Sequence, residues 1–157
     1  MTESMPEVTK HVRPDGGVVV GDDGSDGAAR AVRYALEEAR RRGTTLHVVR
    51  AWSILSTARP ADVPMGFAAS LSEYEASAMA EEKGRVAHLL GETDVPVEVH
   101  VVHSAAAEAL IGASETADVI VVGSRGLGGF RALVLGSVAE RCIRYAAGPV
   151  IVVRERD

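Results

Sequence analysis

The chain has 157 residues, enough for one compact domain and too few for two ordinary ones. Hydrophobic residues make up 46 % of the sequence and aromatic residues only 4 %, so we expect a sizeable core built from aliphatic side chains. The formal net charge of -5 argues against a general nucleic-acid-binding protein, which normally carries a basic face.

Three further features predict a cytoplasmic protein. The single cysteine, Cys142, excludes an intrachain disulfide. No apolar run approaches the roughly 20 residues that a membrane helix needs, so no membrane contact is expected. The first residues lack the basic start and the apolar stretch of a secretory signal. We expect residues 1–16 to form a disordered tail and residues 17–157 to form one domain.

Strand-like apolar runs alternate with helical periods along the first half of this domain. Residues 18–20 form a continuous valine run, as expected for a strand buried on both faces. Apolar side chains at helical spacing over residues 28–39 predict a helix, and the arginines that follow, together with Gly43, are typical of a helix C-terminus. Residues 45–52 predict the second strand. Residues 53–70 predict a loop, whose length is typical of lids and partner-binding surfaces.

The second half continues the alternation. We expect helices at residues 71–90, 105–116 and 137–147, and strands at residues 95–103, 117–124 and 148–155. This order predicts the α/β class, with a doubly wound five-stranded parallel sheet in a single Rossmann-like domain and helices on both faces. If the strand order is 3-2-1-4-5, the winding reverses between strands 1 and 4. Ligands of such sheets bind at that point, outside the carboxyl ends of the strands.

Two unusual loops follow strands 1 and 4 and would meet at this crevice. The first, residues 21–27, reads GDDGSDG, and its carboxylates suit sugar hydroxyls. The second, residues 123–137, reads GSRGLGGFRALVLGS and contains no acid. Its glycine amides, its cations Arg125 and Arg131, and the start of the next helix form a pattern typical of a phosphate site. Together the two loops predict a nucleotide site.

The familiar nucleotide fingerprints are absent from the sequence. It contains no G-x-x-x-x-G-K-[ST] motif, and the loop after the first strand does not read G-x-G-x-x-G. The sequence therefore fits neither a P-loop enzyme nor a standard dinucleotide dehydrogenase.

At these positions the sequence resembles the universal stress protein family. Family members that bind ATP carry the motif G-x2-G-x9-G-[ST] after strand 4, and this chain matches it without a gap at Gly123, Gly126, Gly136 and Ser137. The stretch DDGS at residues 22–25 and the stretch GPVIVVR at residues 148–154 also resemble the family pattern. The resemblance covers residues 17–154, nearly the whole chain.

The resemblance implies that the chain binds ATP, with cyclic AMP as an alternative ligand. Mg²⁺ would accompany ATP to offset its charge. By position, Asp23 would contact the ribose hydroxyls, and the backbone of Ala51 would meet the adenine edge. The glycine motif would hold the ribose and the phosphates. The implied cofactor-binding residues are Asp23, Ser25, Ala51, Gly123, Ser124, Arg125, Gly126, Gly128, Gly136, Ser137 and Val138.

The resemblance also implies a homodimer in which the last strands of two copies pair through Val150, Ile151, Val152 and Val153. An exposed apolar edge strand is a liability unless something covers it, which agrees with this arrangement. Two positions depart from the family pattern. Asp22 stands where the family usually has an apolar residue, and we expect its charge to weaken triphosphate binding. Ser104 replaces a common glycine.

Several of these residues also have a plainer interpretation. Ser137 and Glu140 match the capping box S-x-x-E, so the Ser137 hydroxyl would cap the last helix. Ser25 or Asp26 is better placed than Asp23 to cap the first helix, which favours a ligand role for Asp23. The five histidines form no metal-binding pattern in the sequence, so no metal ligand is predicted.

Our main hypothesis is a cytoplasmic, dimeric stress-response protein that binds ATP and signals through a partner. No residues evidently place a base beside a nucleophile, and no lysine stands in a glycine loop, so any hydrolysis would be slow. Three alternatives stay open: a weak ATP hydrolase or phosphotransferase, a cyclic-AMP binder, and a nucleotide-free interaction protein of the same fold.

Overall fold

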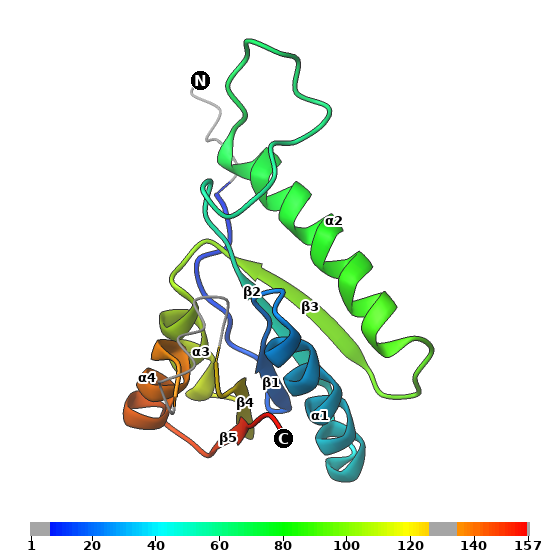
Figure 1. Ribbon diagram of the computed structural model, residues 1–157, viewed down its shortest axis with the longest axis vertical. Coiled ribbons are helices and arrows are strands. Elements are labelled where there is room, and N and C mark those ends of the chain that lie inside the picture. The colour runs from blue at the N-terminus through cyan, green and yellow to red at the C-terminus, as the bar shows by residue number, and fades with distance from the viewer. Residues whose placement is uncertain (1–6, 126–134, 157) are drawn as a thin grey trace.

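The computed structural model describes residues 7–125 and 135–156. Within them the sheet order is β3-β2-β1-β4-β5 with every neighbouring pair parallel, which confirms the predicted sheet (Figure 1). Among the described residues, no helix combines the length and the apolar character that crossing a membrane requires. The elements in chain order are β1 (Val18–Gly21), α1 (Asp26–Arg42), β2 (Leu46–Ala51), α2 (Leu71–Leu90), β3 (Val97–Val102), α3 (Ala106–Ser114), β4 (Val119–Gly123), α4 (Ser137–Tyr145) and β5 (Val150–Val153).

The limits of α1 and α2 follow from local capping. The Ser25 hydroxyl accepts a 3.1 Å hydrogen bond from the Ala28 amide at the start of α1. Gly43 ends this helix in the left-handed region at φ 61°, where a side chain would be strained. At α2, Ser70 and Glu73 form a reciprocal capping box. These caps explain why both helices lie where the sequence predicts them.

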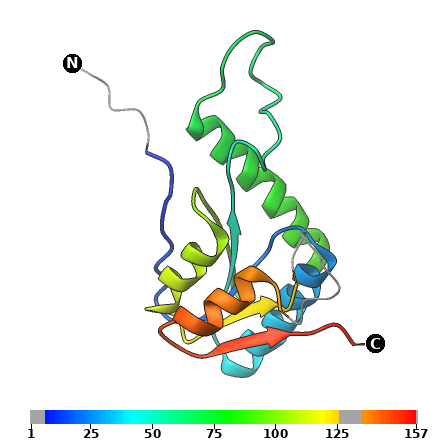
Figure 2. The same ribbon diagram turned by 60° about the vertical axis from the view of Figure 1, so that its left-hand side comes forward.

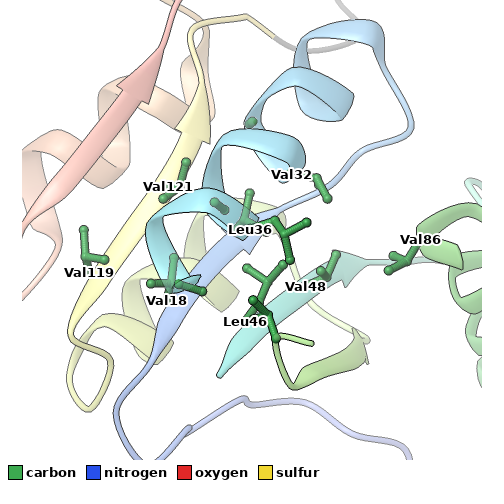
Figure 3. Packing of buried hydrophobic residues seen from close by; sticks show 13 residues of the cluster. Val18, Val32, Leu36, Leu46, Val48, Val86, Val119 and Val121 are labelled. Carbon is green, nitrogen blue, oxygen red and sulfur yellow. The ribbon is translucent and has the colours of Figure 1, made fainter. Parts of the chain in front are cut away.

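The helices cover both faces of the sheet. α1 and α2 lie on one face, and α3 and α4 lie on the other (Figure 1). Because strand side chains alternate between the faces, the strands contribute to two aliphatic cores. The core under α1 and α2 includes Val18, Val32, Leu36, Leu46, Val48, Val86, Val119 and Val121 (Figure 3). The opposite core includes Val19, Val49, Val102, Leu110, Ile120, Val122 and Cys142.

The segment before β1 packs against the domain. We expected residues 1–16 to form a disordered tail, and the described part of that segment corrects this expectation. Val8 and Val12 are buried, and the Thr9 carbonyl accepts a 2.8 Å hydrogen bond from the His103 amide. Two isolated valines give no periodic pattern that sequence reasoning could detect, but they bury enough apolar surface to hold the segment in place.

The predicted loop over residues 53–70 forms no helix or strand. It extends beyond the N-terminal end of α2 and away from the sheet (Figures 1 and 2). Leu55, Met65 and Phe67 on this loop are 98 %, 91 % and 68 % exposed. In this structure the loop therefore adds apolar surface rather than core.

A buried ion pair joins α2 to the loop that follows β1. The fully buried Asp22 carboxylate accepts hydrogen bonds from Arg85 Nε at 2.8 Å and from Arg85 Nη2 at 3.1 Å. Arg85 Nη2 also donates to the Ser25 carbonyl at 3.1 Å. Burial alone would raise the pKa of Asp22, but hydrogen bonds with Glu82 and Arg85 outweigh burial and hold this pKa below its ordinary value. Asp22 is thus an ionised carboxylate whose charge Arg85 neutralises.

Glu82 lies beside this pair on α2 and is 2 % exposed. Burial and a hydrogen bond with Asp22 raise the pKa of Glu82 to about 8. Arg50 Nη1 is 3.6 Å from Glu82 Oε2 and only partly opposes this rise. Among the described residues, Glu82 Oε1 has no hydrogen-bond partner, which fits a carboxyl group that carries its own proton. Burial and the neighbouring Asp22 therefore favour the protonated form of Glu82.

We expect the Glu82→Gln variant to lose a pH dependence of stability that the wild type shows. Between pH 4.5 and about 8, the folded protein holds a proton on Glu82 that the unfolded chain has released. The free energy of unfolding therefore falls as pH rises through this window. From about pH 5.5 to about pH 8.5, the wild type should lose several degrees of melting temperature relative to the variant, because 1 kcal/mol corresponds to about 2–4 °C at this size.

Thermal unfolding followed by circular dichroism at both pH values measures this difference. All other titrating groups are common to the two proteins, so their contributions cancel in the comparison. Parallel pH profiles for the wild type and the variant would show that Glu82 is ionised in the folded protein.

Candidate functional site

The loop after β1 is held in place by its own aspartates. The Asp22 amide donates to the Val49 carbonyl at 2.9 Å, just beyond the end of the strand pair. Asp22 Oδ1 accepts from the Gly24 amide at 3.0 Å, and Asp23 Oδ1 accepts from the Ser25 amide at 2.9 Å. Such short-range bonds are typical of Asx turns. They place the half-buried Asp23 at the carboxyl end of β1, as the sequence predicts.

Ser25 serves α1 directly, because its hydroxyl is the helix cap. Its carbonyl is also engaged, by Arg85. The structure therefore shows Ser25 in the capping role that the sequence also allows.

Gly27 and Gly123 allow the loops after β1 and β4 to touch. A Cβ on Gly123 would lie 3.2 Å from the Gly27 carbonyl oxygen, and a Cβ on Gly27 would lie 3.0 Å from the Arg125 carbonyl oxygen. A side chain at either position would push the two backbones apart. The two loops that the sequence singles out do meet at the crevice, and Gly123 is required for their packing.

The ends of the loop after β4 are joined through their backbones. The Gly136 amide donates to the Ser124 carbonyl at 2.6 Å, and the Ser124 amide donates to the Val153 carbonyl at 2.9 Å. These bonds fix the start and the end of the predicted phosphate loop next to β5. Three predicted site residues of this loop, Gly126, Gly128 and Arg131, lie outside the described residues.

The capping box predicted from Ser137 and Glu140 does not form. Gly136 is the N-cap of α4, and its carbonyl accepts a 3.0 Å hydrogen bond from the Glu140 amide, so Ser137 is the first helical residue. Within the part of the chain that the structure describes, no side chain caps this helix. Its first-turn amides and the positive end of its dipole therefore suit an anion. Val138 is half-buried and packs against the core under α3 and α4.

Arg125 forms an ion pair with a carboxylate that follows β5. Glu155 accepts hydrogen bonds from Arg125 and, at 2.8 Å, from Arg30 on α1. Two cations thus share one acid, and the cluster keeps a net positive charge. A phosphate that approached Arg125 would have to compete with Glu155 for this guanidinium.

A pocket of about 340 Å³ opens at the carboxyl ends of β2 and β3. Its volume lies at the lower end of the range of small-molecule sites, and the pocket is largely open to solvent. Trp52 is buried, and its ring stacks on the His103 ring with the centroids 4.6 Å apart. Ser104, one of the two departures from the family pattern, lines the same pocket. The full lining is Ala51, Trp52, Ser53, Ser56, His103, Ser104 and Ala105. Ala51 therefore borders a space large enough for a flat heterocycle.

Sequence reasoning missed the charged side chains that organise the crevice, namely Arg30, Arg50, Glu82, Arg85 and Glu155. Glu82 did leave a signal, because it shares the buried stripe of α2 with Ala78 and Val86 at four-residue spacing. Arg85 left none, since 63 residues separate it from Asp22. No local pattern predicts an ion pair across that separation.

Comparison with known sequences identifies relatives over nearly the whole chain. The family described as "Universal stress protein family" matches residues 17–154. Universal stress protein Rv1996 of Mycobacterium tuberculosis is 37 % identical over 155 residues, which cover 96 % of this chain and 48 % of that protein. A universal stress protein of Mycolicibacterium smegmatis is 33 % identical over 143 residues, covering 90 % of this chain and 49 % of its own length. The chain thus spans about half the length of these curated relatives.

Solved structures share the fold. A universal stress protein in complex with cAMP superposes with a TM-score of 0.61 at 27 % identity, covering 90 % of this chain and 98 % of that one. The universal stress protein from Archaeoglobus fulgidus in complex with dAMP superposes with a TM-score of 0.58 at 27 % identity. The match covers 87 % of this chain and 96 % of that one. UspA from Lactobacillus plantarum superposes with a TM-score of 0.66 over 92 % of this chain and 100 % of that one. Because its sequence identity is only 17 %, it supports the fold alone. Because the family pattern and the sheet order agree over residues 17–154, this chain belongs to the universal stress protein family.

Proposed function

We propose that this chain binds an adenine nucleotide, with ATP as the first candidate, at the carboxyl ends of β1, β2 and β4. The observation that carries this proposal is the pocket lined by Ala51, on the strand next to β1 and its Asp23 loop. Two structural neighbours at 27 % identity are complexes with cAMP and dAMP, which supports adenine as the base.

The pocket and the loop after β1 suit a nucleoside. The pocket is lined by small side chains such as Ala51 and Ala105 and by His103, whose ring stacks on the buried Trp52. In this arrangement the backbone of Ala51 would hold the adenine edge. The Asp23 carboxylate, oriented by the Ser25 amide, would accept hydrogen bonds from the ribose hydroxyls.

The start of α4 suits phosphates. Helix N-termini bind anions through free amides and the helix dipole, and α4 has no side-chain cap among the described residues. We expected Asp22 to weaken triphosphate binding, but Arg85 neutralises its charge, which removes the physical basis for that expectation. The remaining members of the proposed phosphate loop are Gly126 and Gly128. Mg²⁺ would accompany ATP to offset its charge.

Cyclic AMP is the second candidate ligand, and the neighbour in complex with cAMP favours it. The two ligands share the adenine and ribose contacts. They differ at the start of α4, which would hold a triphosphate in ATP and a single cyclic phosphate in cyclic AMP. In either case we propose a cytoplasmic binding protein that reports nucleotide level to a partner, rather than a fast enzyme.

We further propose that two copies pair through β5. This strand is an edge of the sheet and is hydrogen-bonded only to β4 within the described residues. Its four residues are all half-buried. A second β5 would cover the edge and satisfy its free backbone groups.

Calorimetric titration of the full chain with ATP, with cAMP and with AMP tests the nucleotide proposal. We expect saturable binding that the Gly136→Val substitution weakens at least about tenfold, or ~1.4 kcal/mol. Gly136 has φ -72° and ψ 163°, which any residue adopts, so valine adds bulk at the start of α4 without left-handed strain. A loss of affinity with an unchanged melting temperature of the nucleotide-free protein would therefore report a ligand close to this backbone.

Gly84→Val is the matched control, because a Cβ on this exposed glycine of α2 meets nothing within 4 Å. It should bind like the parent. Equal affinity in all three proteins would refute the placement of the phosphates at α4. Turnover of radiolabelled ATP that disappears in Gly136→Val would favour the hydrolase or phosphotransferase, and absence of any saturable binding would favour a nucleotide-free interaction protein.

The Val152→Asp substitution should dissociate the proposed dimer, because it buries a carboxylate at the centre of the paired strands. Sedimentation velocity at several protein concentrations measures the change. Val97→Asp is the control, since Val97 is also a half-buried valine on an edge strand, at the opposite side of the sheet. A wild-type monomer, or a dimer that survives Val152→Asp, would exclude β5 as the interface.

A further inference from the structure

Two histidines and a glutamate come together across β2 and β3. His47 lies on β2, Glu98 and His100 lie on β3, and the strand register pairs His47 with Glu98. Their neighbours Val48 and Val99 contribute to the core under α1 and α2. Because side chains alternate along a strand, the three polar side chains point to the other face, that of α3 and α4.

The three possible ligand atoms form a compact triangle. His47 Nδ1 is 3.0 Å from His100 Nε2 and 3.2 Å from Glu98 Oε2, and His100 Nε2 is 3.7 Å from Glu98 Oε2. The centre of this triangle is about 1.9 Å from each atom, so an ion slightly outside its plane would lie about 2.0–2.1 Å from each, as Zn²⁺ does from imidazole nitrogen. The atoms are thus spaced for one shared cation.

One side of the cluster is fixed and the other is accessible. His47 is 6 % exposed, and its ring packs on Gly17, where a Cβ would lie 3.0 Å from His47 Cδ2. Gly17 has φ +85°, so both its backbone and this contact require glycine. The side chains of Glu98 and His100 are 61 % and 27 % exposed. An ion held by these three groups would keep a coordination position toward solvent, as in open zinc sites with three protein ligands.

We propose that His47, Glu98 and His100 form a binding site for one divalent transition-metal ion, with Zn²⁺ as the first candidate. Two imidazoles and one carboxylate suit Zn²⁺, whereas Ca²⁺ and Mg²⁺ prefer sets of oxygen ligands. The thiol of Cys142 does not compete, because it is fully buried and burial raises its pKa to about 11. None of His47, Glu98 and His100 lines the pocket that contains Ala51, so the two proposals are independent.

The same cluster has a metal-free interpretation. His47 Nδ1 and His100 Nε2 are at hydrogen-bond distance, and the two rings stack with centroids 5.2 Å apart at 29°. In that case the pair would hold one proton between its nitrogens and would show no response to metal ions. Metal titration therefore separates the two interpretations.

The test uses the full, untagged and nucleotide-free chain after treatment with EDTA. Zn²⁺ is titrated in competition with a chromophoric chelator, and we expect saturation at one equivalent. Co²⁺ in place of Zn²⁺ should give visible d–d bands typical of nitrogen and oxygen ligands. Saturating Zn²⁺ should also raise the melting temperature, because an ion that binds only the folded state stabilises it.

The variants Glu98→Gln and His100→Ala should each weaken Zn²⁺ binding at least about tenfold, since even outer-shell changes cost 10–100-fold at such sites. His88→Ala, which removes an exposed histidine on α2, is the matched control and should bind like the parent. Melting temperatures in EDTA show whether each variant is folded, and the exposed Glu98 makes Glu98→Gln the safer of the two. Unchanged affinity in both variants, or no saturable Zn²⁺ binding by the parent, would overturn the proposal.

Discussion

The bidentate ion pair between Asp22 and Arg85 is the interaction on which the candidate crevice depends. It fixes the loop after β1 against α2, and Arg85 also holds the Ser25 carbonyl at the start of α1. Breaking a buried pair typically costs about 3–5 kcal/mol, because the remaining charge loses its partner. Asp23 follows directly in this loop, so the position of the proposed ribose ligand depends on a helix that is far away in the sequence.

A glycine in the loop after β4 can be required by a contact within the protein or by the close approach of a ligand. Gly123 and Gly136 differ in this respect. Gly123 packs against the Gly27 carbonyl, so its lack of a side chain is required by the contact between loops. Gly136 has ordinary dihedral angles and needs no glycine for its backbone. Its place as the N-cap of α4, where glycine is favoured, is one reason for glycine there, and close approach by a ligand is another. Of the two, Gly136 is therefore the more informative position for a ligand.

The fold could be predicted from the sequence because its determinants are local. Valine runs, helical spacing and caps such as Ser25 and Gly43 each act within a few residues. Winding rules then restrict the topology to a few parallel arrangements, and the order assumed among them is the one that the structure shows. The buried charges could not be predicted in this way. Asp22 meets Arg85 across 63 residues, and His47 meets His100 across 53. Contacts of this kind depend on strand register and helix docking, which a single sequence does not display.

Strand β2 connects the two proposed sites. His47 near its start and Ala51 at its end point to the same face, because four residues separate them, and the rise along a strand puts them about 13 Å apart. None of the three proposed metal ligands lines the pocket, so the ion and a base in the pocket would share no side chain. The ion would instead tie the edge strand β3 to β2, and the carboxyl ends of these two strands form the pocket walls. Any coupling between metal and nucleotide would therefore act through the stiffness of this strand pair rather than through a shared ligand.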